Sequence, residues 1–246
     1  MQVMNAILDP LKKEFFVDAL LKWHKINSRD FPWRNTLDPY KILISEILLQ
    51  KTRAENVVPV FNSFSKKYPS VEKLSAASYS ELKNEIEILG LSNQRATKLQ
   101  KLARILVDKY DGKVPDNKKE LLELPGIGIY IANAVLCFAF GYDVPLLDTN
   151  IGRIIERVFS IKVSGEERKK EKVWEMIAEF VPEGKAREYN YSLIDFGALV
   201  CTARNPKHNL CPLTEICEYY KSPKNKNSAV NSRSLVLQHY NPCKKS

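Results

Sequence analysis

The stretch Leu124-Pro125-Gly126-Ile127-Gly128 is a short hairpin with two glycines, and the rest of the chain is best interpreted outward from it. An almost wholly apolar segment, 129–140, follows and is typical of a buried helix. Glycine lets a backbone come close to a phosphate, and the free N–H groups at a helix start attract anions. The stretch therefore predicts an anchor for a DNA backbone, although an ordinary glycine turn before a core helix would have the same pattern.

The remaining sequence also has helical periodicity. The segment 9–25 carries apolar residues at helix spacing, and Asp38-Pro39 is typical of a helix start, with aspartate as the cap and proline in the first turn. Strand-like alternation is absent, so the sequence predicts an all-α protein. Further helices are expected at 57–67, 71–76, 79–86, 93–110, 117–123, 129–140, 150–159, 169–181, 186–199 and 214–220.

The expected helices group into two lobes. Residues 39–144 are predicted to form a six-helix lobe that contains the hairpin. Residues 1–38 are expected to join residues 145–220 in a second lobe, which contains a cluster of cysteines. Residues 221–246 are rich in lysine, asparagine and serine and are predicted to be a basic, solvated and disordered tail.

Composition restricts the class of protein. The 246 residues carry 38 basic and 29 acidic side chains, a net charge of +9, and 44% hydrophobic residues. This hydrophobic content is globular, and the positive charge favours polyanionic partners, although solubility alone could explain the charge. No apolar run of membrane-spanning length and no signal peptide is visible, so we expect no membrane contact and a cytoplasmic location.

Cysteine usage points to a metal site. The five cysteines, at 137, 201, 211, 217 and 243, are an odd number in a chain without an export signal, which argues against a disulfide framework. With His208, three of them form the pattern Cys201-x6-His208-x2-Cys211-x5-Cys217. Four such ligands in one loop suit zinc or an iron–sulfur cluster, and the alternative is three buried thiols without metal.

Three polar side chains in apolar surroundings are candidates for chemistry. Glu46 lies in the apolar run 42–49, where burial would keep the carboxyl protonated as a general acid requires, unless it lies on a polar stripe. Asp148 precedes a predicted helix and suits a cap, and a capping carboxylate held ionised by the helix dipole could also stabilise a cationic sugar. Tyr130 stands at the entrance of the helix after the hairpin, where a core aromatic is the alternative.

Together these residues resemble the helix-hairpin-helix DNA glycosylases, the superfamily of endonuclease III and the adenine glycosylase MutY. The likeness extends over about residues 20–220. Its landmarks, in order, are Phe31-Pro32-Trp33-Arg34, Ser45-Glu46, Gln50-Lys51-Thr52, Leu124-Pro125-Gly126-Ile127-Gly128, Leu147-Asp148-Thr149-Asn150 and the cysteine loop. The resemblance implies two helical lobes, with DNA and a base flipped out of the stack in a cleft between them.

The resemblance also implies roles for individual residues. Asp148 matches the catalytic aspartate of the family, Gln50 the residue that fills the space left by the flipped base, and Leu91 the wedge against the opposite strand. The residues that it assigns to DNA binding are Gln50, Lys51, Thr52, Leu91, Gly126 and Gly128. Tyr130 and Glu46 join Asp148 as candidate catalytic residues.

Position 130 distinguishes the subfamilies. Endonuclease III has a lysine there, which attacks the sugar, and adenine glycosylases usually have serine. Tyr130 is similar to the archaeal-type mismatch glycosylases that remove thymine or uracil opposite guanine, so we expect that activity with little or no AP lyase activity. The alternatives are an adenine glycosylase acting on A:G or A:8-oxoguanine, which Glu46 would suit, and a non-catalytic DNA-binding module.

His208 departs from the family pattern, which has a cysteine at that place. Histidine can ligate iron and also suits a Cys₃His zinc site. The family spacing favours a [4Fe–4S] cluster, with zinc as the less favoured occupant. The expected partner is double-stranded DNA with a mismatched or damaged base, bound by a monomer in the nucleoid.

Overall fold

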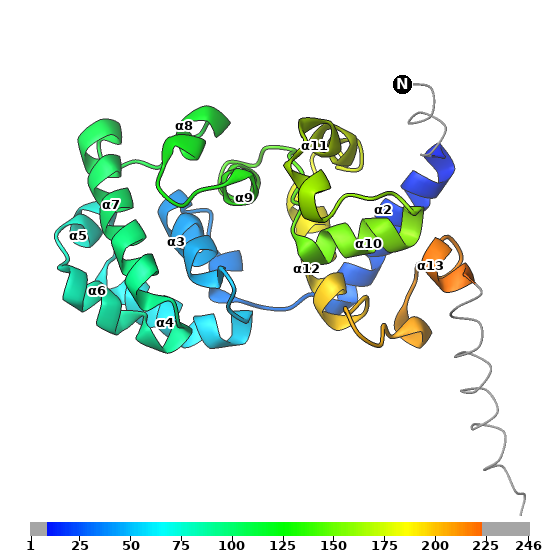
Figure 1. The fold of residues 1–246 in the computed structure, drawn as a ribbon, viewed down its shortest axis with the longest axis horizontal. Coiled ribbons are helices and arrows are strands. Elements are labelled where there is room, and N and C mark those ends of the chain that lie inside the picture. The colour runs from blue at the N-terminus through cyan, green and yellow to red at the C-terminus, as the bar shows by residue number, and fades with distance from the viewer. Residues whose placement is uncertain (1–8, 223–246) are drawn as a thin grey trace, which may run out of the picture. The chain divides into compact units, whose positions relative to one another are not determined.

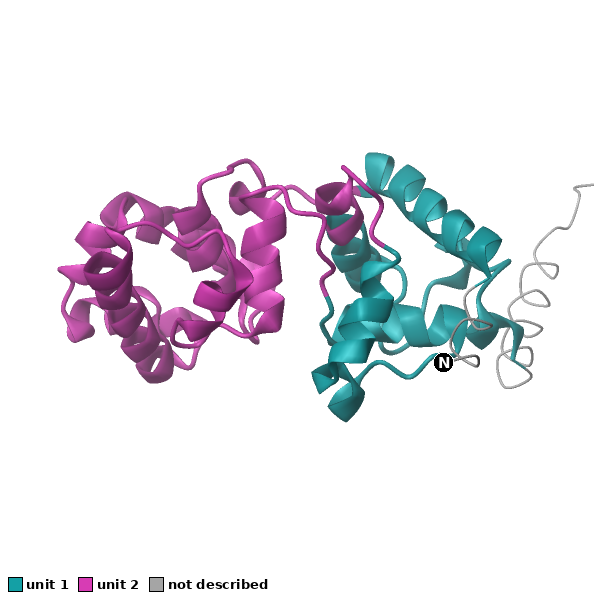
Figure 2. Ribbon diagram, turned by 90° about the horizontal axis from the view of Figure 1, so that it is seen from above, with its two compact units in different colours: residues 1–27, 147–180, 191–246 teal, residues 28–146, 181–190 magenta. Residues whose placement is uncertain are grey.

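The computed structural model describes residues 9–222, and within that range it is helical without strands. The chain divides into two compact units (Figure 1, Figure 2). Unit 2 comprises residues 28–146 and 181–190, and unit 1 comprises the rest. The chain thus leaves unit 1 at residue 28, returns at residue 147, and enters unit 2 once more for residues 181–190. The lobe limits predicted from the sequence, 39–144 for one lobe and 1–38 with 145–220 for the other, remain a prediction.

Unit 2 contains the hairpin and is built from helices of varied length (Figure 1). Its elements are η1 (Pro32–Arg34), α3 (Pro39–Leu49), α4 (Ala54–Lys67), α5 (Val71–Ser75), α6 (Tyr79–Glu85), η2 (Glu87–Leu89), α7 (Ser92–Tyr110), α8 (Lys118–Glu123) and α9 (Ile129–Phe138). The helix α12 (Ala186–Leu199) begins in unit 2 and ends in unit 1.

The predicted six-helix lobe is wrong in its count, because residues 39–144 contain the seven α-helices α3 to α9. The short helices are separate elements because each has its own cap. Ser70, Ser78 and Asn117 each accept a hydrogen bond from a backbone N–H of the first turn that follows. Such a side-chain cap satisfies a donor that the helix itself leaves free.

The core of unit 2 forms where α3 packs against α4 and α9. Ile42 to Leu48 of α3 and Ile131 to Phe138 of α9 are buried on every side. Helix α7 instead buries one stripe, including Leu99, Leu102 and Leu106, and packs with it on α5 and α6. An all-round apolar helix is a core helix, and an amphipathic one is a surface helix.

Unit 1 is held by aromatic side chains. Its elements are α2 (Pro10–Asn27), α10 (Thr149–Phe159), η3 (Gly165–Lys169), α11 (Glu171–Ala178), the end of α12, η4 (His208–Leu210) and α13 (Glu218–Lys221). Phe16, Phe159 and Phe180 meet edge to face, with ring centroids 5.0–5.9 Å apart. Such pairs add to the burial of the rings themselves.

Helix ends differ from the expected ones by a few residues. The predicted helix 169–181 corresponds to α11, which begins at Glu171, after η3 has ended at Lys169, and ends at Ala178. The short helix expected at 214–220 begins only at Glu218. The predicted tail lies outside the described residues from position 223 on. Between residues 9 and 222, no helix is long and apolar enough to cross a membrane.

Candidate active site and metal loop

The hairpin is a turn anchored by its apolar residues. Leu124 and Ile127 are buried, and the backbone N–H of Ile127 donates to the carbonyl of Leu124 at 3.2 Å. Gly126 has φ +83°, and a Cβ there would lie 2.8 Å from Cδ of Lys98. Gly128 has an ordinary φ of −103° and open space around the position of a Cβ. Gly126 is therefore required by the fold, whereas nothing within the fold requires Gly128.

Gln50 lies against this hairpin at the end of α3. Its side-chain Nε2 donates to the carbonyl oxygen of Gly126 at 3.3 Å. The next residue, Lys51, is exposed and has φ 56°, a left-handed conformation that is unusual for a side chain with a Cβ. The structure thus brings three of the residues predicted to bind DNA, Gln50, Lys51 and Gly126, to one place in unit 2.

Leu91 is also left-handed and exposed. It precedes α7 with φ 53°, follows Gly90 with φ 72°, and leaves 49% of its surface in solvent. A large apolar residue held outward in a strained loop is suited to insertion between bases. The Thr52 hydroxyl lies 3.3 Å from the carbonyl oxygen of Leu89, so the loops of Gln50 and Leu91 are neighbours.

Glu46 is buried within α3, with 7% of its surface exposed. Its neighbour Ser45 is also buried and donates its hydroxyl to the carbonyl of Ile42 at 2.8 Å. The alternative of a polar stripe on an exposed face is therefore wrong for Glu46. The carboxyl of Glu46 is therefore largely shielded from bulk solvent, as the apolar run around it predicts.

Tyr130 is the second residue of α9 and is half-buried, whereas the eight residues after it are fully buried. Tyr130 is thus only partly withdrawn from solvent, and its role in chemistry stays a prediction. Its position in the first turn places it beside the glycines of the hairpin in unit 2.

Asp148 caps α10 in unit 1. Its Oδ1 accepts hydrogen bonds from the backbone N–H groups of Asn150 at 2.9 Å and Ile151 at 2.7 Å. Its Oδ2 accepts one from the side-chain amide of Asn150 at 3.1 Å. The predicted cap is confirmed. These three donors fix the orientation of the carboxylate at the start of α10.

The cysteine loop is fastened to α10 by two arginines that the sequence alone did not single out. Arg153 donates to the carbonyl oxygens of Cys201 and Gly197, both at 2.9 Å. Arg157, one turn later, donates to the carbonyl of Thr202 at 2.7 Å and to Sγ of Cys201 at 3.4 Å. The i, i+4 spacing of two arginines before a cysteine loop is the signal that could have identified them.

The three thiols of the loop lie within electrostatic range of one another. Burial raises the pKa of Cys211 to about 11, against a hydrogen bond from the backbone of Leu213, and the neighbouring thiols Cys217 and Cys201 raise it further. Burial likewise raises the pKa of Cys217. Buried thiols become thiolate ligands when a metal supplies the positive charge. The residues therefore fit a thiolate-bound cofactor.

His208 opens η4 and is half-buried, with its ring 4.9 Å from that of Tyr220. Burial, and after it the charge of Arg157, lower the pKa of His208 and so favour the neutral imidazole, which is the form that binds metal. No three His, Cys, Asp or Glu side chains within residues 9–222 are close enough to hold one metal ion together.

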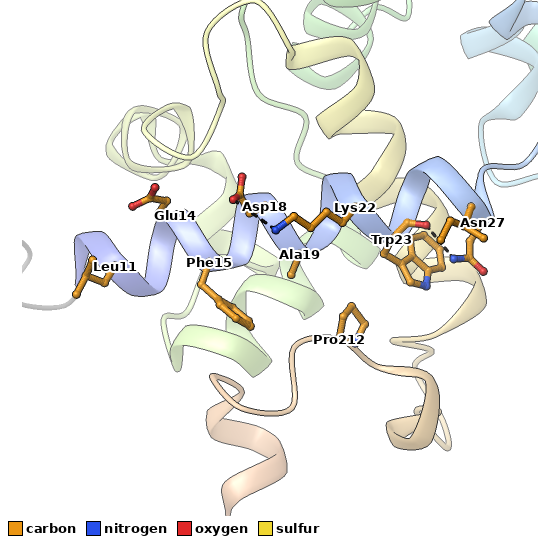
Figure 3. A pocket seen from close by; sticks show the side chains of 10 residues that line it. Leu11, Glu14, Phe15, Asp18, Ala19, Lys22, Trp23, Asn27 and Pro212 are labelled. Carbon is orange, nitrogen blue, oxygen red and sulfur yellow. Dashed lines mark hydrogen bonds and ion pairs between the residues drawn. The ribbon is translucent and has the colours of Figure 1, made fainter.

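Two of the pockets in the described part of the chain lie in unit 1, and the candidate catalytic residues line neither of these. A pocket of about 630 Å³ runs along α2 beside Pro212, with Phe15, Ala19 and Trp23 on its wall (Figure 3). A second, of about 400 Å³, lies between α10 and α13 and includes Arg153, Arg157 and Tyr219.

Comparison with protein families gives two matches. Residues 44–179, which include the hairpin and Asp148, match the HhH-GPD superfamily of base excision DNA repair proteins. Residues 201–217, which begin and end at cysteines of the loop, match the iron–sulfur binding domain of endonuclease III. The second match confirms the prediction of a [4Fe–4S] cluster as the cofactor of this loop.

Three relatives illustrate the likeness. The chain is 41% identical to a thymine/uracil-DNA glycosylase of Methanothermobacter thermautotrophicus, over 85% of this chain and 95% of that protein. A solved structure of a thermostable thymine-DNA glycosylase superposes with a TM-score of 0.81 at 40% identity, over 86% of this chain and 98% of the other. An adenine DNA glycosylase of Buchnera aphidicola is 36% identical, over 85% of this chain and 59% of that protein.

Proposed function

Because the chain belongs to the HhH-GPD superfamily of base excision DNA repair proteins, we propose that it removes thymine or uracil opposite guanine from double-stranded DNA. The reaction hydrolyses the N-glycosidic bond and leaves an abasic site. The structural observation that carries the proposal is the carboxylate of Asp148, which three hydrogen bonds hold in place at the start of α10.

Asp148 is assigned to charge stabilisation. When the bond between the base and C1′ breaks, the base leaves with the electron pair and the sugar becomes cationic. An ionised carboxylate that is already oriented stabilises this charge without reorganising at the moment of reaction. Water then adds to C1′, and the proton that it releases balances the negative charge of the departing base.

Glu46 and Tyr130 are assigned to the base and its surroundings. A buried, protonated Glu46 would donate a hydrogen bond or a proton to the leaving base. Tyr130 has no amine with which to form a Schiff base, so the reaction ends at the abasic site. The enzyme is therefore monofunctional under this proposal.

DNA binding is assigned to the hairpin and to two exposed loops of unit 2, those of Gln50 and Leu91. The backbone at Gly126 and Gly128 and the start of α9 would bind phosphate oxygens. Gln50 would fill the space that the flipped nucleotide leaves, and Leu91 would act as a wedge against the opposite strand. Lys51 and Thr52, which follow Gln50, would contact the DNA backbone. One chain would bind one mismatch as a monomer on nucleoid DNA.

The cluster ligands are assigned to Cys201, His208, Cys211 and Cys217. A bound cluster would cross-link the loop and would take no part in base removal. Because Arg153 and Arg157 hold the loop to α10, the loop would present the exposed Arg204 and Lys207 to a DNA phosphate.

The test is a panel of duplexes with T:G, U:G, A:G and A:8-oxoguanine pairs, each incubated with the enzyme and cleaved by alkali at abasic sites. We expect cleavage at T and U opposite G and none with Asp148→Asn. Cleavage only at adenine would establish the adenine glycosylase instead, for which the buried Glu46 is the favourable observation. Tight binding without any cleavage would leave a DNA-binding module.

A further inference from the structure

Arg95 is a buried cation in the first turn of α7, with 2% of its surface exposed. Its guanidinium donates to four oxygens of two loops. Nη1 bonds the carbonyls of Gly90 at 2.7 Å and Leu89 at 3.3 Å. Nη2 bonds the carbonyl of Gln50 at 2.6 Å and the hydroxyl of Thr52 at 2.9 Å.

No carboxylate accompanies this charge in the described part of the chain. Burial is the one cause that lowers the pKa of Arg95, so neutral oxygens alone compensate the charge. A buried cation without a counterion is costly, and replacement by apolar residues is often tolerated when a cation serves only packing. The hydrogen-bond partners of Arg95 therefore indicate why a charged residue stands at this buried position.

Both loops that it bonds are strained. Lys51 has φ 56° directly after Gln50, and Leu91 has φ 53° directly after Gly90 with φ 72°. Left-handed residues with a Cβ persist only where surrounding contacts determine them. The carbonyls on Arg95 precede these residues: that of Gln50 precedes Lys51, and that of Gly90 precedes Leu91.

We propose that Arg95 is a positioning residue that couples the loop of Gln50 to the loop of Leu91, so that both side chains enter the duplex together. The inference rests on the roles proposed above for Gln50 and Leu91. A guanidinium suits this task because its planar fork of five N–H donors reaches both loops at once. A lysine ammonium reaches fewer of the four oxygens and lacks the planar geometry.

The first test compares Arg95→Lys and Arg95→Met with the same changes at Arg104, an exposed residue of the same helix. Single-turnover excision is measured on a T:G duplex and on a duplex with the target thymine opposite an abasic-site analogue, and affinity is measured on undamaged duplex. We expect the Arg95 variants to lose roughly 10- to 100-fold in T:G excision, as misplacement by about an ångström does. Affinity should change by less than about threefold, and the Arg104 variants should match the parent.

The unpaired thymine separates positioning from damage to the fold. Extrusion is easier when the target has no pairing partner, so the Arg95 defect should shrink on that duplex. An equal loss on both duplexes, with a lowered melting temperature, would overturn the proposal in favour of a purely structural role. Wild-type excision by Arg95→Lys and Arg95→Met would also overturn it.

A second measurement tests the coupling itself. In the parent enzyme, the effects of Gln50→Ala and Leu91→Ala on T:G excision should not multiply, because the two side chains act together. In the Arg95→Met background the two effects should multiply. If neither single variant lowers excision, the proposed roles of Gln50 and Leu91 fail. If both do and their interaction is unchanged by Arg95→Met, only the coupling fails.

Discussion

Oδ1 of Asp148 lies 2.7 Å from the backbone nitrogen of Ile151, so the carboxylate assigned to catalysis also caps α10. Asparagine caps a helix about as well as aspartate but carries no charge. We therefore expect Asp148→Asn to lower excision roughly 100- to 1,000-fold while stability changes by less than about 0.5 kcal/mol. Single-turnover excision and a urea unfolding curve measure the two effects.

Asp148→Ala is the matched control. It removes both the charge and the cap, so it should lose activity and also about 1 kcal/mol of stability. Turnover by Asp148→Asn at the parental rate would mean that the residue is a cap alone, and the proposed chemistry would then be wrong.

The two hairpin glycines should respond differently to alanine. Gly126→Ala places a Cβ at φ +83° and against Lys98, so it should cost about 1–2 kcal/mol of stability. Gly128→Ala meets open space at φ −103°. Alanine is a poorer helix cap than glycine, which lowers stability, but it also reduces the entropy of the unfolded chain, which raises stability. Each effect is about 0.5–1 kcal/mol, so the free energy of unfolding should change little.

Affinity for DNA then tests the anchor. If a phosphate approaches Gly128 closely, Gly128→Ala should weaken duplex binding and flatten the dependence of log affinity on log salt, because fewer counterions are released. A normally folded Gly128→Ala protein with parental affinity and salt dependence would show that the hairpin is no anchor.

Tyr130→Lys introduces an amine at the start of α9, where Tyr130 is half-buried. We expect it to gain weak strand cleavage and a covalent DNA adduct that borohydride traps, since an amine attacks the sugar to give a Schiff base. Tyr130→Phe is the control and should form no adduct. A trapped adduct with the parent enzyme would contradict the monofunctional assignment.

Glu156, near the end of α10, should make the stability of the protein depend on pH. Its Oε1 accepts from the backbone N–H of Val163 at 3.0 Å, and from the N–H and hydroxyl of Ser164 at 2.9 and 2.7 Å. Burial opposes ionisation, but these hydrogen bonds outweigh it and lower the pKa of Glu156. Folding therefore favours the ionised form of Glu156. Its contribution to stability is fully present above the pKa of the unfolded state and is lost as the pH falls through the pKa of the folded state.

We accordingly expect Glu156→Gln to lose about 1 kcal/mol at pH 7 and to approach the parent in stability below about pH 4. Urea unfolding at several pH values measures this. Glu175 of α11, which is exposed, is the control, and Glu175→Gln should follow the parent throughout. A constant difference at all pH values would show that the effect is one of packing.

Features carried by local pattern could be predicted from the sequence. The helices, the cap at Asp148 and the buried Glu46 follow from periodicity and from a polar residue within an apolar run, which depend on neighbours in the chain. The left-handed Lys51 and Leu91 could not be predicted in this way, since neither residue type favours that conformation.

The arginines show the same limit more clearly. Arg95 reaches Gln50 across 45 positions, and Arg153 reaches Cys201 across 48. Such contacts exist only once the helices have packed. The spacing of Arg153 and Arg157 could mark them as a pair on one helix face, but their partners could not be predicted from the sequence, and nothing local distinguishes Arg95. His208 departs from the family pattern in the sequence, but the tyrosine that packs on its ring is visible only in the structure.

The metal loop gives the last prediction. If His208 ligates the cluster, low pH should release iron early, because a protonated imidazole cannot bind metal. His208→Cys should keep about four irons per chain and retain them at lower pH than the parent, and His208→Ala should lose part of the iron. Iron analysis and the visible absorption of anaerobically purified protein, followed from pH 8 to 5, measure this.

Cys137 provides the control, since it is a buried thiol outside the loop that accepts a hydrogen bond from Asn190 at 3.3 Å. Cys137→Ala should leave the iron content unchanged, whereas Cys201→Ala should lower it and loosen the loop that Arg153 and Arg157 hold to α10. Because the cluster takes no part in base removal, His208→Cys should excise thymine at the parental rate. Iron loss that is identical in the parent and in His208→Cys at every pH would remove His208 from the ligand set and leave three thiolates with a fourth ligand from elsewhere.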